Sequence, residues 1–275
     1  MFLTQLKKIA SLLLIGILFS SCSEYQQLLK KGDLATKYKA AEKYYKEGEY
    51  KKALRIFELI VPAYRGKPQA ERVLFYEADT YYNLEDHYIA TYKMERFLAA
   101  FPKSDKAEEV AFKEAHSMYE LSPRYSLDQK ETLTAIDKFQ NFISEYPDSE
   151  YQEKANEYVT ELRGKLERKY YEIAKQHHHR ELYKAAITAF GNYLIDYPGS
   201  AYSEKALFYR FESAYILAIN SYKELIPERL ATAKEYFEAY DKISKNENLK
   251  EKAQKIFEDI EQRQKVINTT EEYGS

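Results

Sequence analysis

The sequence is poor in the residues on which disulfide-rich, strand-rich and many catalytic proteins depend. In 275 residues it has one cysteine, no tryptophan, 8 glycines and 7 prolines. A single cysteine excludes an internal disulfide framework, and the scarcity of turn-forming residues without strand-like alternation favours an all-helical chain. No Ser–His–Asp arrangement, glycine-rich phosphate loop or zinc-protease motif occurs. We therefore expect a protein without catalytic residues and without a cofactor.

The balance of charge excludes another class of partner. The chain has 42 basic and 44 acidic residues, a net charge of −2, and the two signs alternate along the sequence. It therefore lacks the basic stripe of a nucleic-acid-binding protein. Tyrosine is abundant instead, with 28 residues. The apolar ring and polar tip of tyrosine suit contacts between helices that stay partly wet.

A fifteen-residue block recurs along the chain. Residues 70–84 return 37 residues later as residues 107–121 with eight identical positions, and a weaker third copy covers residues 203–217. Within each copy the apolar residues fall at helical spacing. A recurring helical block of this size is the sequence signature of a repeat array. The sequence therefore predicts a stack of similar helices.

The N-terminus carries a segment that directs export. Lys7 and Lys8 precede an apolar run at residues 9–19, which is too short to span about 30 Å of hydrocarbon. The sole cysteine, Cys22, follows two serines, and the pattern resembles a bacterial lipoprotein signal, although Phe19 stands where leucine is more usual. The resemblance implies cleavage before Cys22 and its acylation, for example by palmitate, which would anchor the protein in outer-membrane lipid. The alternative is an ordinary signal peptide followed by an unmodified cysteine.

The remaining chain divides into five helix–turn–helix units with small and aromatic residues at fixed places. This arrangement resembles the tetratricopeptide repeat, a motif of about 34 residues. The resemblance implies an α-solenoid in which the small residues let paired helices approach closely. In unit five, Phe211 stands where the first small residue is expected. The small residues are Ala41, Ala53, Ala78, Ala90, Ala115, Ala135, Ala174, Ala186 and Ala233; the aromatic or methionine residues are Tyr44, Phe57, Tyr81, Met94, Phe139, Phe190 and Phe237.

Three of the prolines mark joints between units, each in a Phe-Pro or Tyr-Pro turn. Proline disfavours the helical conformation of the residue before it, and a serine or aspartate after it is expected to cap the next helix. Asp105 with Glu108, and Ser149 with Gln152, have the spacing of a capping box.

Insertions interrupt the regular spacing at residues 122–130, 151–166 and 220–228. We expect the second insertion to continue into the next helix despite Gly164, and residues 249–266 to form a last, capping helix. The expected organisation is a lipoprotein signal peptide at 1–21, a lipidated lead-in at 22–32, units one to three at 33–148, the long connecting helix with units four and five and the capping helix at 149–267, and a flexible tail at 268–275.

Two rows of aromatic residues fall on the first helix of each unit, which lines the concave surface in such arrays. They predict a groove for an extended or helical peptide, with aromatic anchors carrying the affinity. The alternative is that both rows pack between neighbouring units, because aromatic stripes at helical spacing often belong to a core. Arg124 and Tyr125 in the first insertion add residue types that are enriched at binding hot spots, or else belong to a longer turn. The first row is Tyr38, Phe75, Phe112, Tyr171 and Phe208, and the second is Tyr45, Tyr82, Tyr119, His178 and Tyr215.

Three consecutive histidines, His177, His178 and His179, invite a metal interpretation. On a helix, however, adjacent side chains point about 100° apart and do not converge on one ion. The spacing also differs from that of known metal sites. We therefore expect no metal site.

The order of these parts resembles the BamD family, the lipoproteins of the outer-membrane β-barrel assembly (Bam) complex. The specific pieces are the Cys-Ser-Glu-Tyr-Gln start, the insertion Ser-Pro-Arg-Tyr-Ser-Leu-Asp-Gln, and the extra helix before unit four. The resemblance implies a non-enzymatic scaffold, lipid-anchored in the outer membrane and facing the periplasm. Its N-terminal units would bind unfolded outer membrane proteins, and its C-terminal half the periplasmic domains of a BamA-like barrel insertase.

Two other functions remain open on the residues alone. One is another tetratricopeptide-repeat lipoprotein adaptor, in pilus assembly or cell-envelope constriction. The other is a glycan-capturing surface lipoprotein, which would need solvent-facing tryptophan or tyrosine platforms, and tryptophan is absent.

Overall fold

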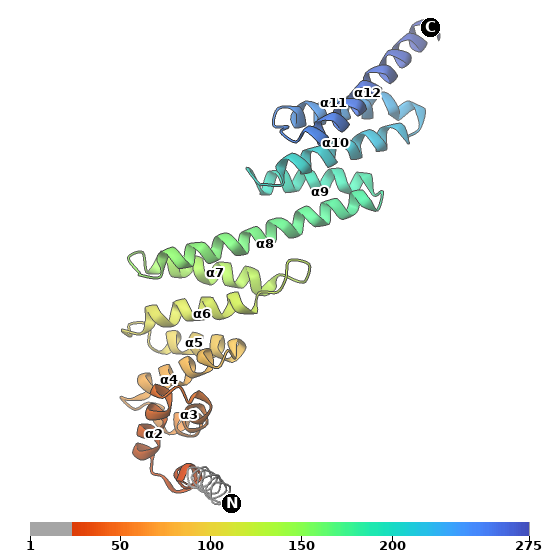
Figure 1. Ribbon diagram of the computed structural model, residues 1–275. Coiled ribbons are helices and arrows are strands. Elements are labelled where there is room, and N and C mark those ends of the chain that lie inside the picture. The colour runs from red at the N-terminus through yellow and green to blue at the C-terminus, as the bar shows by residue number, and fades with distance from the viewer. Residues whose placement is uncertain (1–23, 275) are drawn as a thin grey trace, which may run out of the picture. The chain divides into compact units, whose positions relative to one another are not determined.

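The computed structural model describes residues 24–274, with side chains as far as Thr269. The predicted signal peptide and the predicted lipidation site, Cys22, lie outside these residues. Every regular element in the described part of the chain is a helix, as the sequence predicts (Figure 1). Within residues 24–274, no helix has the length and apolar character needed to cross a membrane.

The chain packs as two compact units. The first comprises the described residues up to 123 together with 129–162, and the second comprises residues 124–128 and the chain from 163 onward. The division predicted from the sequence, between residues 148 and 149, falls at a joint between repeats, whereas the packing divides the chain within a helix. The first unit begins with a helical segment at residues 24–31. Its paired helices are α2 (Leu34–Lys46) with α3 (Tyr50–Tyr64), α4 (Ala70–Asn83) with α5 (His87–Ala100), and α6 (Ala107–Leu121) with α7 (Lys130–Glu145).

Helix α8 runs without a break from Gln152 to His179 and includes Gly164, and the second unit begins within it, at residue 163. The last helix, α12, continues to Gly274, into the stretch predicted to be a flexible tail. Ile267 packs beside the core of this unit, which extends the helix beyond the predicted end at 266. The remaining elements are α9 (Tyr183–Asp196), α10 (Ser203–Ile219), the short 3-10 helix η1 (Lys223–Leu225), α11 (Ile226–Asp241) and α12 (Glu247–Gly274).

The small and aromatic columns predicted from the sequence form the core of both units. Every alanine at the two small positions is fully buried, and so is Phe211, which takes one of those places. Phe57, Met94, Phe139 and Phe190 are also fully buried. Small residues therefore sit where paired helices approach most closely, and large ones fill the space beside them. This pattern confirms an α-solenoid of tetratricopeptide-like units.

The capping box predicted at Asp105 is not formed, so that prediction is wrong. Helix α6 begins after Lys106, which provides no side-chain cap. Instead, the Ser104 hydroxyl accepts the Lys106 N–H at 3.0 Å, and the hydroxyls of Ser149 and Ser200 accept the N–H two residues on, at 3.1 and 2.9 Å. Each serine therefore fixes the turn before the helix rather than the helix's first turn.

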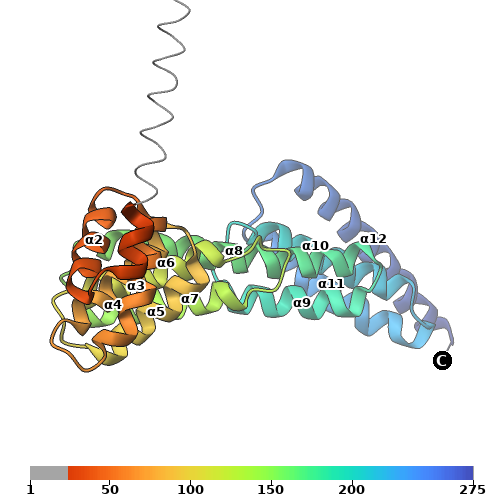
Figure 2. The ribbon, with the colours of Figure 1, turned by 90° about the horizontal axis from the view of Figure 1, so that it is seen from below.

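The first helices of the three N-terminal units pack against one another as well as against their own partners. Helix α4 contacts both α2 and α6 (Figures 1 and 2). Side chains that point across these contacts therefore come together from three different repeats.

Candidate polypeptide-binding surface

The predicted aromatic rows of the first unit lie where α2, α4 and α6 meet, and we call this region the A-helix face. Phe75 is buried, with 7% of its surface exposed, and the other five residues are half-buried. The rings therefore pack between repeats and keep part of their surface accessible. The face comprises Tyr38 and Tyr45 on α2, Phe75 and Tyr82 on α4, and Phe112 and Tyr119 on α6, with the polar residues that join them.

Several polar contacts between neighbouring repeats share an offset of 34 residues. The Tyr45 hydroxyl donates a hydrogen bond to Asp79, 34 residues further along. Because the repeated block returns after 37 residues, Tyr45 reaches a residue one helical turn before its own equivalent. The second unit uses the same offset: His178 Nε2 lies 3.1 Å from Glu212 Oε2. The polar tips of the second aromatic row thus join consecutive repeats.

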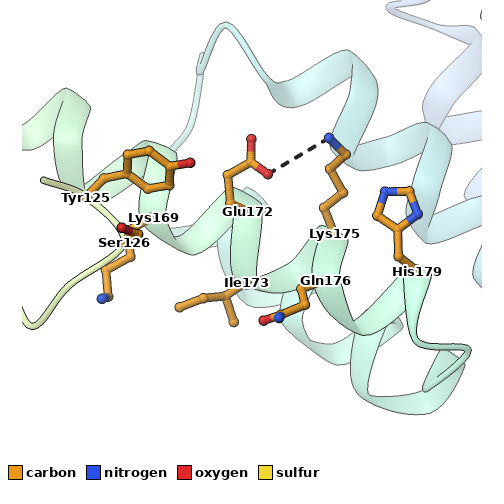
Figure 3. Close-up of a pocket in the computed structure, with 8 residues that line it drawn as sticks. All are labelled: Tyr125, Ser126, Lys169, Glu172, Ile173, Lys175, Gln176 and His179. Atoms are coloured by element: carbon orange, nitrogen blue, oxygen red, sulfur yellow. Dashed lines mark ion pairs between the residues drawn. The ribbon is translucent and has the colours of Figure 1, made fainter.

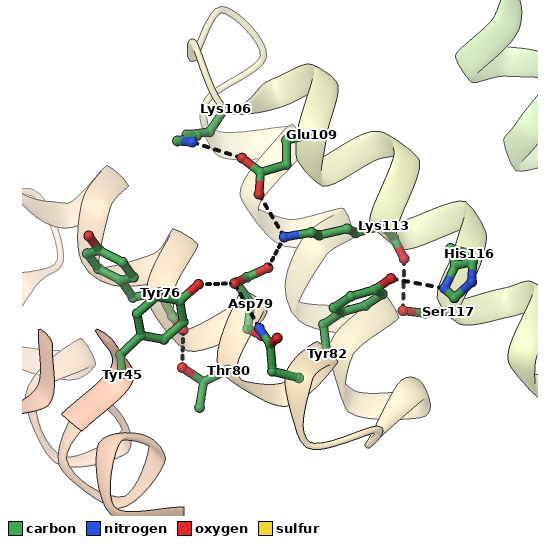
Figure 4. Close-up of polar contacts among 11 residues, drawn as sticks. Tyr45, Tyr76, Asp79, Thr80, Tyr82, Lys106, Glu109, Lys113, His116 and Ser117 are labelled. Carbon is green, nitrogen blue, oxygen red and sulfur yellow. Dashed lines mark hydrogen bonds and ion pairs between the residues drawn. The ribbon is translucent and has the colours of Figure 1, made fainter. Parts of the chain in front are cut away.

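A buried carboxylate lies at the centre of the A-helix face (Figure 4). Asp79 is 1% exposed and accepts hydrogen bonds from Tyr45 and from Lys113 Nζ at 2.5 Å. Lys113 also donates to Glu109 at 2.7 Å. Although burial opposes its charge, Asp79 and Glu109 hold the pKa of Lys113 above its ordinary value. Burial and the bond to Asp79 raise the pKa of Tyr45, which therefore remains a donor.

Phe75 lines a cavity of about 380 Å³ on one side of this network. Phe75 and Tyr76 supply its aromatic surface, and Glu71, Arg72 and Lys106 surround it with charge. Lys106 Nζ lies 5.1 Å from the centre of the Phe75 ring. The cavity therefore combines an aromatic wall with positively and negatively charged residues at its rim.

Tyr82 lines a second cavity, of about 360 Å³, on the other side of the network. Its hydroxyl lies 3.0 Å from His116 Nδ1, and His116 Nε2 lies 3.4 Å from Glu120. Burial lowers the pKa of His116, so the imidazole is neutral at pH 7. Glu85 and His87 complete a polar rim.

The two cavities follow the same helix. Phe75 and Tyr82 are separated by seven residues, or about 10.5 Å along the axis of α4. An extended polypeptide covers that distance in about three residues. Asp79, which lies between Phe75 and Tyr82 on α4, pairs with Lys113.

Three other members of the rows line neither of these two cavities. Phe112 stacks on Tyr151 with ring centres 4.5 Å apart, and Tyr119 packs against Tyr158 of α8 at 4.4 Å. Burial raises the pKa of Tyr38 to about 12. For these three residues the contacts favour packing between repeats, whereas Phe75 and Tyr82 line cavities.

The two insertion residues belong to the second unit. Residues 124–128 pack with the chain from 163 onward, and the Arg168 guanidinium lies 4.1 Å from the centre of the Tyr125 ring. Arg124 is exposed. In the histidine run, His178 Nδ1 also lies 2.9 Å from the Ser213 hydroxyl. Among residues 24–274, no three His, Cys, Asp or Glu side chains are gathered as they would be around a metal ion.

Sequence reasoning missed two buried ion pairs at equivalent places. Lys93 Nζ lies 2.6 Å from Glu77, which is 2% exposed, and Lys138 Nζ lies 2.5 Å from Glu114, which is 7% exposed. Each glutamate directly precedes the small alanine of its first helix, and each lysine directly precedes the large core residue of its second. Comparison of these two columns for opposite charge would have found both pairs.

Helical repeats joined by polar tyrosine tips, with aromatic cavities on the A-helix face, define an α-solenoid of the tetratricopeptide class. The chain belongs to the YfiO family, described as outer membrane lipoprotein, whose model matches residues 31–230. A comparison with curated proteins found no match.

Two solved structures are similar at low scores. One is the tetratricopeptide-repeat domain of P58(IPK), with 19% identity and a TM-score of 0.30, covering 88% of this chain and 61% of that one. The other, from a computational design of self-assembling cyclic homo-oligomers, has 15% identity and a TM-score of 0.20, covering 94% of this chain and 96% of that one.

Proposed function

We propose that this protein is a non-enzymatic scaffold of the outer-membrane β-barrel assembly complex. Its membership of an outer membrane lipoprotein family is the observation that carries the proposal. In this role, acylated Cys22 holds the protein at the outer membrane, facing the periplasm. The first unit receives unfolded outer membrane proteins, and the second binds the periplasmic domains of a BamA-like insertase.

The A-helix face supports the substrate part of this proposal. An unfolded membrane protein offers extended segments with aromatic side chains, and aromatic cavities are the sites where such side chains bind. The cavities at Phe75 and Tyr82 would take side chains about three residues apart on an extended segment. The charged rims would contact the peptide backbone and neighbouring polar side chains.

The role in assembly is tested by affinity purification from detergent-solubilised envelopes together with depletion of the protein. We expect the barrel insertase to copurify and porin levels in the outer membrane to fall on depletion. Normal porin levels with no insertase recovered would refute the proposal.

The substrate site is tested with a matched pair of variants. Tyr82→Ala changes the second aromatic row in the first unit, and Tyr215→Ala changes the same repeat position in the second. A photo-crosslinkable peptide from an outer membrane protein should crosslink several-fold less to Tyr82→Ala and normally to Tyr215→Ala. Equal losses in both variants, or no loss in either, would contradict the assignment to the A-helix face.

The anchor is tested by mass spectrometry of the purified protein. We expect the mature chain to begin at Cys22 and to carry acyl groups. A Cys22→Ala variant should retain its signal peptide and carry no lipid. A mature wild-type chain with an unmodified thiol would remove the anchor from the proposal.

A further inference from the structure

The insertion at residues 124–128 forms one wall of a cavity of about 440 Å³ on the second half of α8 (Figure 3). Its contacts with α8 include a ring contact and a hydrogen bond. The Arg168 guanidinium lies over the Tyr125 ring at 4.1 Å, and Lys169 Nζ donates to the Leu127 carbonyl at 2.5 Å. The insertion is therefore fixed against the helix by a cation–π contact and a charge-assisted hydrogen bond.

The opposite wall is a stripe of α8 with both apolar and polar groups. Ile173 keeps 38% of its surface exposed and forms the apolar part. Gln176 on this helix and Ser126 on the insertion add an amide and a hydroxyl that can form hydrogen bonds with a peptide backbone. Together with Tyr125, these groups can enclose a few side chains of a bound segment.

The charge of this cavity is positive. Among the lining residues, Lys169 and Lys175 outweigh Glu172 by one positive charge. Lys175 is held only weakly, because its Nζ lies 3.9 Å from Glu172. Lys175 is therefore the cation that can turn toward an incoming anion at the lowest cost.

We propose that this cavity binds an acidic segment of a partner protein. A carboxylate of the segment pairs with Lys175, and an adjacent apolar side chain lies against Ile173 and Tyr125. The site is distinct from the A-helix face and does not depend on the assembly role. A hollow with hydrogen-bonding groups fits a peptide better than a flat layer of anionic headgroups.

The proposal is tested by fluorescence anisotropy with the full-length protein in detergent. The probe is a labelled hexapeptide with the sequence Glu-Asp-Leu-Phe-Asp-Glu, and its matched neutral peptide is Gln-Asn-Leu-Phe-Asn-Gln. The variants are Lys175→Glu, the charge-preserving Lys175→Arg, and Lys252→Glu, which reverses an exposed lysine of α12 outside the cavity. Circular dichroism melts check that all three variants fold.

We expect the acidic peptide to bind at least tenfold more tightly than the neutral one. Lys175→Glu should weaken its binding about tenfold, whereas Lys175→Arg and Lys252→Glu should change it less than twofold. A benzophenone side chain placed at position 173 should crosslink to the acidic peptide in preference to the neutral one.

Equal binding of the two peptides, equal effects of Lys175→Glu and Lys252→Glu, or no crosslink at position 173 would overturn the proposal. So would binding of phosphatidylglycerol vesicles that is lost in Lys175→Glu while the peptide fails to bind, because the surface would then be assigned to lipid. A failed envelope purification leaves these outcomes unchanged, so the two proposals are tested separately.

Discussion

The buried pair of Glu77 and Lys93 makes the sharpest prediction about stability. Glu77 is 2% exposed, and its contact with Lys93 Nζ at 2.6 Å is made by only one carboxylate oxygen. The second oxygen, Oε2, is buried and has no hydrogen-bond partner in the described structure. Lys93→Met keeps most of the side-chain volume and leaves the carboxylate without its cation.

Breaking a buried ion pair by removal of one partner costs about 3–5 kcal/mol, because the remaining charge stays desolvated. The side chain of Lys93 is 23% exposed, so water can reach the vacated place and the cost should lie near the lower end. We therefore expect a loss of about 3 kcal/mol in the free energy of unfolding. The double variant Glu77→Gln with Lys93→Met removes both charges and should recover most of that loss.

The measurement is urea denaturation followed by far-UV circular dichroism, with the four proteins of the double-mutant cycle. Lys255→Met is the control, since its pair with Glu251 is exposed on both sides and should leave the transition unchanged. The reasoning fails if Lys93→Met costs less than about 1 kcal/mol. It also fails if the double variant is no more stable than Lys93→Met.

Two further predictions concern the A-helix face. Tyr45→Phe removes one hydroxyl donor to the buried Asp79 and should lower the free energy of unfolding by about 1 kcal/mol, measured by the same denaturation. An unchanged transition would mean that Lys113 and Asn83, which donates to the same carboxylate at 3.0 Å, satisfy it without Tyr45. For His116, burial puts the folded-state pKa below the unfolded value of about 6.5. The unfolded state then binds more protons, so wild-type stability falls as the pH drops through this window. Against a His116→Gln variant, wild-type stability should therefore decline between about pH 8 and pH 5; a constant difference between the two would refute this.

The helices and the core could be predicted because they depend on features within single repeats. The column of alanines is visible in the sequence, and close approach of two helices requires small residues wherever that column recurs. Continuation of α8 through Gly164 followed from the same helical spacing. The end of α12 did not, because the helical path of Ile267 depends on its packing beside the second unit's core.

The orientation of the aromatic rows could not be predicted, because it depends on the fit between repeats. A one-turn offset brings Tyr45 opposite Asp79 rather than opposite the equivalent tyrosine, Tyr82. No single repeat specifies that offset. The burial of Asp79 at this contact could not be predicted either. Nothing in the sequence distinguishes this carboxylate from the other acidic residues, which number 44 with it, until the neighbouring helices are in position. Tyr125 could be predicted as a binding residue from its residue type. Its contact with Arg168 could not, because that contact depends on how the insertion packs against α8.

In unit five, Arg210 and Tyr236 occupy the two positions that form the buried ion pairs of units two and three. Their contact explains why residue 191 is a glycine. There the Arg210 guanidinium lies 4.0 Å from the centre of the Tyr236 ring and donates to its hydroxyl at 3.1 Å. A Cβ on Gly191 would lie 3.3 Å from the Arg210 Nη2, tighter than an ordinary contact.

In the interior of a helix, alanine is favoured over glycine by about 1 kcal/mol. Displacing the Arg210 guanidinium from Tyr236 would cost about as much through the lost cation–π contact and hydrogen bond. Gly191→Ala should therefore be close to neutral in the wild type and stabilising by about 1 kcal/mol in an Arg210→Met background, where the space is free. Urea denaturation of the four proteins measures the coupling. If the alanine stabilised both backgrounds equally, Gly191 would not be required to make room for Arg210.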